Sequence, residues 1–125
     1  MTAIGTRLAP QEIVERVLAL AAQRNTAGCV AIVSETGEAA LRWANSTMTT
    51  NGLSVSYRVA VIVLVPVNGG TAAGVVESST AITDVTQLVD LVDAAERAAR
   101  DAGPARDAAP LPQPEQDDPT WFEPA

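Results

Sequence analysis

Few residues of this chain could do chemistry, and the types that are missing narrow the choice. The 125 residues include no histidine, no lysine and one cysteine, Cys29. Histidine is the commonest general base at neutral pH and the commonest metal ligand. Its absence removes Ser-His and Cys-His nucleophile pairs and the usual zinc sites. Cys29 has no base to activate it, so we interpret it as a small core residue at the start of a strand.

The acidic residues form no convincing site either. Glu35 and Glu38 flank an expected turn, where they could act as an acid-base pair or hold a metal, but turn carboxylates are usually just solvated. Glu115, Asp117 and Asp118 lie in a proline-rich segment without a scaffold to fix metal ligands. We therefore predict no catalytic residue, no metal ligand and no cofactor-binding residue in this chain, which by itself is expected to be non-catalytic.

Composition and charge argue against nucleic-acid binding and against a membrane span. The net charge is −7 with a pI near 4.3, and the eight positive charges, all arginine, are scattered from Arg7 to Arg106. Nucleic-acid binding needs a concentrated basic face, so we expect no nucleic-acid partner. The longest purely apolar stretch, Val59–Val65, is far short of the roughly 20 residues of a membrane span. One cysteine and the lack of a charged-then-apolar leader favour the cytoplasm.

The elements that must position these residues are organised around one apolar run, Leu53–Val67. Its first half alternates apolar and polar residues, whereas from Val59 onward both faces are apolar. This pattern predicts a central strand that begins at the rim of a sheet and becomes covered on both sides. Fifteen extended residues would span about 50 Å, so we expect a bend or bulge. Pairing should become one-sided at Pro66.

The remaining pattern predicts a helix, four strands and a second helix. An apolar stripe indicates a helix over Pro10–Arg24, and Asp84 with Gln87 forms a capping box for a helix that Gly103-Pro104 ends. The expected strands and connections are a first strand Cys29–Glu35, a turn at Thr36-Gly37, a second strand Glu38–Ala44, a polar connection Asn45–Gly52, the central strand, a turn at Asn68–Gly70 that is too short for a phosphate cradle, and a fourth strand Thr71–Ser78 with closely packed Gly and Ala.

The fold class is therefore α+β: a four-stranded antiparallel meander with both helices on one face, in two layers. We divide the chain into a flexible N-terminal segment 1–9, one domain over 10–104, and a linker or tail over 105–125. That tail contains five prolines and five acidic residues. Trp121-Phe122 is out of place in a solvated tail, so we expect this pair to dock onto something.

Taken in order, several stretches resemble the N-terminal domain of the TldD/PmbA (TldE) metallopeptidase family, once called modulators of DNA gyrase. They are Ile13–Ala21, Arg42-Trp-Ala-Asn-Ser46, the polar turn into Leu53–Val63, Ala73-Gly-Val-Val-Glu-Ser-Ser79, and the helix Asp84–Ala102 followed by Leu111-Pro-Gln-Pro114. The resemblance covers roughly residues 10–114 and rests on the order and spacing of short motifs. The loop Pro66–Gly70 departs from the short charged turn usual in that family.

The resemblance implies a cytoplasmic two-domain protein whose second domain carries the chemistry. In TldD-type members that domain holds a zinc site built on a His-Glu motif and a second His, whereas PmbA/TldE subunits lack these ligands. The two subunits form a dimer around a cavity that admits unfolded peptides. No residue here matches the zinc motif, so this chain would be a non-catalytic domain that helps to form the chamber wall and dimer contacts. The alternative is a free-standing α+β adaptor that binds a partner or peptide.

Assembly is the last expectation. Apolar side chains on both faces of the central strand would leave an exposed patch if helices cover only one face, and such patches usually mark interfaces. We therefore predict a two-fold dimer, or pairing with a TldD/PmbA-type subunit, through the sheet face or the adjacent edge. The interface candidates are Val59, Val61, Ile62, Val63, Leu64, Val65, Trp121 and Phe122. The rival arrangement wraps the first helix and the tail over the second face within one chain.

Overall fold

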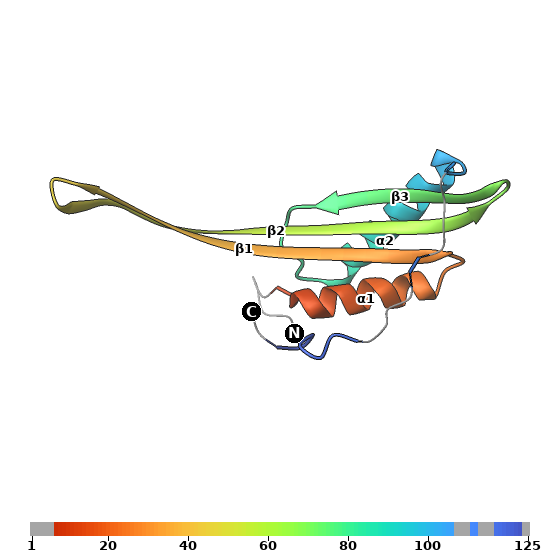
Figure 1. Ribbon diagram of the computed structural model, residues 1–125, viewed down its shortest axis with the longest axis horizontal. Coiled ribbons are helices and arrows are strands. Elements are labelled where there is room, and N and C mark those ends of the chain that lie inside the picture. Colours follow the sequence, from red (N-terminus) through yellow and green to blue (C-terminus); the bar gives the residue numbers. More distant parts are fainter. Residues whose placement is uncertain (1–6, 107–110, 113–116, 124–125) are drawn as a thin grey trace.

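A computed structural model describes residues 7–106, 111–112 and 117–123, apart from the side chains of 48–51. The element order is α1 (Pro10–Ala22), β1 (Gly28–Ala44), β2 (Thr47–Val67), β3 (Gly70–Ser78) and α2 (Val85–Ala102). The three strands form one antiparallel sheet in the order β1-β2-β3, so the apolar run is the central strand as predicted (Figure 1). The α+β class is confirmed, but the sheet has three strands and not four.

The error lies in the expected turn at Thr36-Gly37. These two residues pair with Ser56 and Val55, so β1 runs through them without interruption. The chain reverses instead at Asn45-Ser46, whose φ angles of 51° and 62° are left-handed. Two consecutive positive φ values match the right-handed twist of a two-residue hairpin, and asparagine tolerates them well. Most of the expected polar connection Asn45–Gly52 is therefore strand.

β2 is long because its first half extends beyond the rest of the sheet. β2 has 21 residues, and β3 pairs only with its second half, from Val59 to Val67. The hairpin of β1 and β2 extends far beyond β3 and both helices (Figure 1). One register shift occurs near its tip, between Arg42 and Trp43. Pairing of β2 with β1 ends at Leu64, so Pro66 pairs on the β3 side alone, as expected for a residue without an N–H donor.

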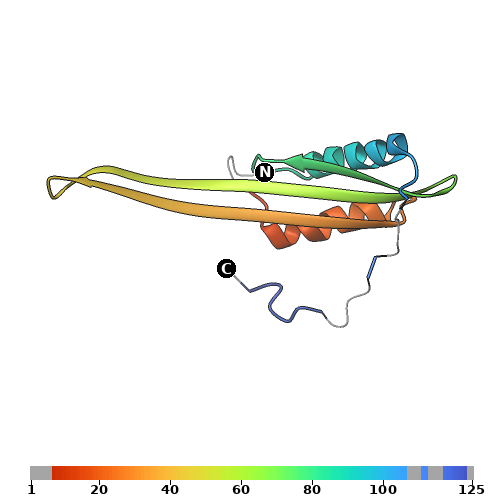
Figure 2. The same cartoon turned by 45° about the horizontal axis from the view of Figure 1, so that its top comes forward.

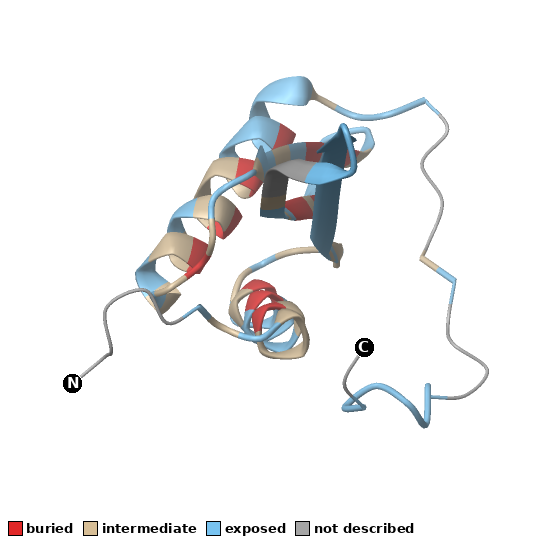
Figure 3. Ribbon diagram, turned by 90° about the vertical axis from the view of Figure 1, so that its left-hand side faces the viewer, coloured by how far each residue is buried: buried red, intermediate tan, exposed pale blue. Residues whose placement is uncertain are grey.

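Both helices pack on the same face of the sheet. Alternate residues of β2 point toward them: Val59, Val61, Val63 and Val65 are at most 1% exposed. Figure 3 looks along the sheet and shows the buried positions of each helix turned toward the strands. The helical part of this core comprises Ile13, Val17, Leu88, Val92, Ala95 and Ala99, and β3 adds Ala72. The buried face of β2 and the apolar stripes of the two helices thus pack together in one core between the sheet layer and the helix layer.

The contact between β3 and α2 is unusually close. A Cβ atom on Gly74 would overlap the backbone O of Ala95 and the backbone N of Ala99, and would lie 3.0 Å from Ala99 Cα. Alanine at these helix positions and glycine in the strand let the two backbones approach. The predicted capping box of α2 is present: Thr86 N–H donates to Asp84 Oδ1 at 2.9 Å, and Asp84 N–H donates to Gln87 Oε1 at 3.0 Å.

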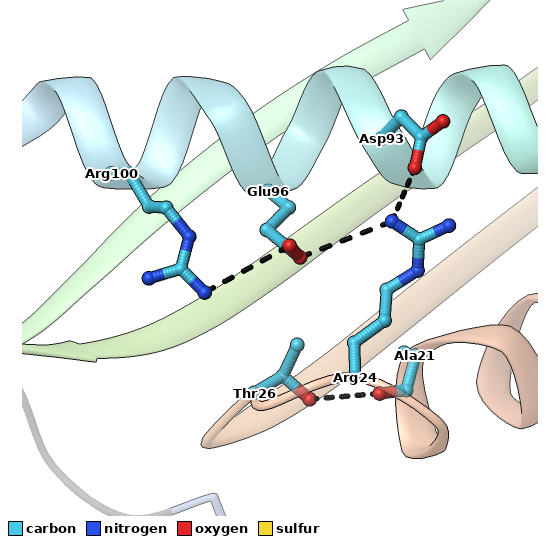
Figure 4. A network of polar contacts seen from close by, with 6 residues as sticks. All are labelled: Ala21, Arg24, Thr26, Asp93, Glu96 and Arg100. Atoms are coloured by element: carbon cyan, nitrogen blue, oxygen red, sulfur yellow. Dashed lines mark hydrogen bonds and ion pairs between the residues drawn. The ribbon is translucent and has the colours of Figure 1, made fainter.

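A polar network joins the end of α1 to α2 (Figure 4). The Arg24 guanidinium forms an ion pair with Asp93 and lies 3.9 Å from Glu96 Oε2, while Arg100 reaches the other oxygen of Glu96 at 3.8 Å. Thr26 Oγ1 donates to the carbonyl of Ala21 at 3.1 Å, which satisfies a carbonyl at the helix end. The network fixes the two helices side by side on the sheet.

Described residues on both sides of the domain contact it. Within the expected N-terminal segment 1–9, residues 1–6 lie outside the described residues, but Leu8 N–H donates to the Ile82 carbonyl at 2.7 Å. Described parts of the tail carry turns without helix or strand, and the tail passes along the α1 side of the molecule (Figure 2). Among the described residues, each helix is too short or too polar to cross a membrane.

Candidate interaction surfaces

The most exposed part of the fold is the end of the β1–β2 hairpin. We define the arm as residues 34–58, the part of the hairpin beyond the last β2–β3 pair, Val59 with Ser78. At about 3.3 Å per residue the arm reaches about 35 Å from the sheet. A two-stranded ribbon of this kind is marginally stable alone, because each strand has only one hydrogen-bonded neighbour. The arm therefore needs packing against something to be a rigid element.

One face of the arm is an apolar stripe. Register places Val55 opposite Gly37 and Leu53 opposite Ala39, and Leu41 follows two residues later on the same face. Leu53 is 78% exposed and Trp43, two residues beyond Leu41, is 64% exposed. We define the arm stripe as Leu41, Trp43, Leu53 and Val55. It continues the face that the helices cover in the body, so the core side of the sheet runs on beyond the two helices.

The opposite face of the arm is polar. Thr36 faces Ser56 and Glu38 faces Ser54, and all four side chains are exposed. The arm is thus amphipathic, with apolar and polar residues separated by the pleat of the ribbon. Such separation is typical of a strand pair with one face against a protein surface and one face in water.

An ion pair and an aromatic contact hold the root of the arm. Arg7 donates to both carboxylate oxygens of Glu35, at 3.0 and 2.5 Å. Its guanidinium also lies 5.7 Å from the centre of the Tyr57 ring, on the paired strand. The bidentate geometry ties Arg7 to Glu35, which pairs with Tyr57 at the root of the arm. The hydrogen bond from Arg7 lowers the pKa of Glu35 from its ordinary value of 4.5.

The Arg7–Glu35 contact should be visible in a pH titration. A carboxyl whose pKa is lowered on folding favours the folded contact above pH 4.5 and loses it as the pH falls through the lowered value. We expect the Glu35 side chain to titrate below pH 4.5 by NMR, and Arg7→Gln to raise its midpoint toward 4.5. Glu38→Gln, on the same strand but the opposite face, is the control and should leave the Glu35 midpoint unchanged. An Arg7→Gln protein with an unchanged midpoint would contradict the contact.

The second apolar surface is the outer face of the sheet, opposite the helices. Register brings Val30, Ile62 and Val75 side by side across the three strands, and Ile32 and Val75 are 53% and 57% exposed. Leu111 of the tail covers one end of this face. Its Cδ1 lies so close to Gly28 that a Cβ there would be 2.7 Å away, and Leu64 packs beside it. The tail therefore covers the outer face only in part.

The structure divides the predicted interface residues into three groups. Val59, Val61, Val63 and Val65 lie in the core beneath this chain's own helices, which explains half of the two-sided apolar pattern without a partner. Ile62 and Leu64 face the outer side and are half-buried. Trp121 and Phe122 lie near α1, and Trp121 also lines a hollow together with Val33 of β1.

The aromatic pair of the tail borders a groove on α1. Trp121 and Phe122 face Val14 and Leu18 across a groove of about 460 Å³. Asp118 accepts hydrogen bonds from the backbone and hydroxyl of Thr120 at 2.8 and 2.7 Å, and these bonds lower the pKa of Asp118. Phe122 remains 74% exposed. The tail pair is thus placed beside α1, where apolar residues of both segments meet.

A polar hollow of about 570 Å³ lies where β3 ends. Ser34, Thr36, Ser56 and Arg58 line it together with Ser79. Beyond this point no described strand pairs with that edge of β2. Free strand edges of this kind accept an added strand. The lining carries one charged group and no nucleophile with a base, so the hollow has no catalytic arrangement.

Cys29 lies on the helix-covered face and packs against the core. Burial raises the pKa of its thiol above the ordinary 9.0. Since the thiolate is the reactive form, this cysteine is a poor nucleophile near neutral pH. We expect Cys29 to react with a thiol reagent at pH 7.5 at least 10-fold more slowly in the folded protein than in 6 M guanidinium chloride. Equal rates in the two conditions would show that the thiol is exposed.

The carboxylates considered as sites do not converge. Glu35 and Glu38 lie three residues apart on one strand, so they point to opposite faces and cannot form an acid-base pair. Within the described ranges, which include Asp117 and Asp118 but not Glu115, no cluster of three metal-binding side chains occurs.

Comparison of the chain with protein families, with curated proteins and with solved structures finds no match. The resemblance to TldD/PmbA proteins consequently remains a prediction from the sequence.

The arm was missed from the sequence, although a signal was present. On one side of the reversal Leu41-Arg42-Trp43 alternates apolar and polar residues, and on the other side Leu53-Ser54-Val55-Ser56 does the same. The assumed turn at Thr36-Gly37 cut that alternation into two short strands, so its continuity was not used.

Proposed function

We propose that this chain is a non-catalytic interaction domain, and that it serves as the N-terminal domain of a TldD/PmbA-type zinc metallopeptidase. In this role it forms part of a peptide-chamber wall and contributes contacts between subunits. The hydrolytic zinc site belongs to a second domain with the His-Glu motif. The observation that carries the interaction role is the arm stripe, four large apolar side chains on a projecting ribbon that stand 46 to 78% exposed. The peptidase context comes from the sequence resemblance.

The free energy lost by leaving these apolar side chains in water supports the interaction role. Burying a side chain of Val or Leu size is worth about 1.5 to 3 kcal/mol, so a fold that leaves four such groups in water forgoes much stabilisation. Apolar groups gathered on one face, backed by a polar face, are typical of an interface. In the proposed setting the arm stripe and the outer sheet face would contact the second domain or the partner subunit.

The test combines assembly with activity. The purified chain is incubated with zinc and an unfolded peptide, alone and together with a TldD-type domain that carries the zinc motif. We expect cleavage only in the mixture, co-elution of the two proteins, and loss of both with Leu53→Asp. Ser56→Asp, on the polar face of the same strand, is the control and should retain both. Chelator-sensitive cleavage by this chain alone would overturn the non-catalytic assignment, and failure to co-elute would overturn the peptidase context.

The groove on α1 favours a second candidate, a free-standing adaptor that docks a peptide. Trp121 and Phe122 border this groove with apolar residues of α1, so a tethered aromatic pair could exchange with an aromatic peptide. Deletion of 110–125 separates the candidates. An adaptor should lose or change its peptide binding, whereas a peptidase domain should keep its folding and its self-association.

A further inference from the structure

We propose that the arm is the self-association surface of this protein, and that two copies pack their arm stripes against each other across a two-fold axis. The occupant of the arm stripe is thus a second copy of this chain. The inference rests on the proposed function for the interaction role and adds the partner and the contact surface to it.

The arm stripe continues the face of the sheet that the helices cover. Leu53 and Val55 lie on the same face as Val59 and Val61, which the helices bury completely. Past the root of the arm, no helix continues over this face (Figure 1). The tail does not replace the helices there, because Leu111 lies against Gly28 and the segment 117–123 lies beside α1. Among the described residues, the stripe is therefore an uncovered extension of the core.

The arm stripe is complementary to a second copy of itself. A two-fold interface places the same patch on both sides, so any charge on the patch would face its own copy. The stripe and the small residues between its members, Gly37 and Ala39, carry no charge. Glu38 lies on the opposite face, and Glu35 at the root is already paired with Arg7. Two copies can thus meet stripe to stripe without like-charge repulsion at the contact, although each carries a net charge of −7.

The exposed area of the arm stripe approaches the size of a specific interface. From their exposed fractions, the four residues of the stripe present on the order of 500 Å² per copy, so complete burial in two copies would remove about 1,000 Å² from water. Specific interfaces begin near that size, whereas most incidental contacts are smaller than about 800 Å². Trp43 and Leu53 provide the large apolar groups that typically dominate binding. The two-stranded arm also gains the second layer that an isolated ribbon lacks.

The outer sheet face is a weaker candidate for the self-association surface. Ile62 and Leu64 are already half-buried, and the tail covers one end of the face through Leu111. Its most exposed members, Ile32 and Val75, stand on the two outer strands and do not form one ridge. The outer face is therefore the competing site, and its variant serves as a control below.

Sedimentation velocity and light scattering on the purified chain, from 1 to 200 μM, test the proposal. We expect a concentration-dependent dimer whose dissociation constant rises at least 100-fold with Leu53→Asp and with Trp43→Asp. Ser56→Asp on the polar face and Val75→Asp on the outer face should each change it less than 3-fold. Because every substituted residue is exposed, circular dichroism should show the wild-type fold for all four variants.

A local probe keeps the test decisive if an aspartate variant folds poorly. In a Trp121→Phe protein, Trp43 is the remaining tryptophan. Its emission should shift to longer wavelength on dilution, as the side chain passes from the dimer contact into water. A wild-type monomer at 200 μM overturns the proposal, as does a dimer that Leu53→Asp and Trp43→Asp leave intact. A monomer that still co-elutes with the zinc-bearing domain leaves the proposed function standing, whereas a dimer that does not co-elute removes the peptidase context alone.

Discussion

Gly74→Ala is expected to destabilise this protein by about 3 kcal/mol or more, despite adding a single methyl group. The added Cβ would overlap the backbone O of Ala95 and the backbone N of Ala99. Backbone atoms cannot rotate away as a side chain can, so α2 would have to move off the sheet and open the core around Leu88 and Val92. For a domain of ordinary stability that loss is a large fraction of the total.

Gly37→Ala is the matched control, since Gly37 is also a strand glycine. A Cβ at Gly37 meets no atom within 4 Å, and the residue has no positive φ angle. Replacing it should be neutral or stabilise by about 0.4 to 1 kcal/mol, because alanine restricts the unfolded chain. Urea unfolding followed by circular dichroism measures both variants. Equal midpoints for Gly74→Ala and the wild type would show that α2 does not approach β3 so closely.

Val63→Asp is expected to abolish the native fold at 25 °C. Val63 is fully buried under the helices, and the described core around it contains no buried polar or charged residue. An aspartate there would have to be buried as an unpaired charge or be protonated, and either costs several kcal/mol. The packing of a valine is lost as well, so the change falls among the largest single-residue effects.

Val75→Asp is the control, because it places an aspartate in the same sheet at a position that is not buried. Val75 belongs to the same sheet but stands 57% exposed on its outer face. Aspartate disfavours a strand by about 1 kcal/mol, so this variant should fold with a modestly lower midpoint. Thermal melts compare the unfolding midpoints of Val63→Asp and Val75→Asp. A folded Val63→Asp protein would contradict the assignment of the odd-numbered valines of β2 to the helix side.

Several elements could be predicted because their signals are local. The capping box of Asp84 and Gln87, the apolar stripe of α2 and its end at Gly103 lie within one short segment, and each acts through hydrogen bonds or packing along that segment. The turn at Asn68-Gly69 is likewise local, since Gly69 has a φ angle of 93°. The apolar run Val59–Val65 also predicted a central strand, which the structure confirms, although the outer face of that strand is covered only in part.

The turn of the first hairpin shows where local signals compete. Thr36-Gly37 and Asn45-Ser46 both suit a turn by composition. Which pair reverses the chain depends on whether the residues between them find partners on β2, and that pairing is a contact between distant segments. The sequence alone therefore left the choice open, and the wrong choice replaced one long strand by two short ones.

The sequence by itself determined that this chain has an α+β core built from Val, Leu, Ile and Ala, with no histidine and no lysine to build a conventional active site. Tertiary structure alone decided which face of β2 the helices cover and where that cover ends. The alternation of Leu53 and Val55 is the same pattern as that of Val59 and Val61, yet the first pair is exposed and the second is buried. The reason is that burial is a property of neighbours brought together by folding, and α1 and α2 do not extend along the arm.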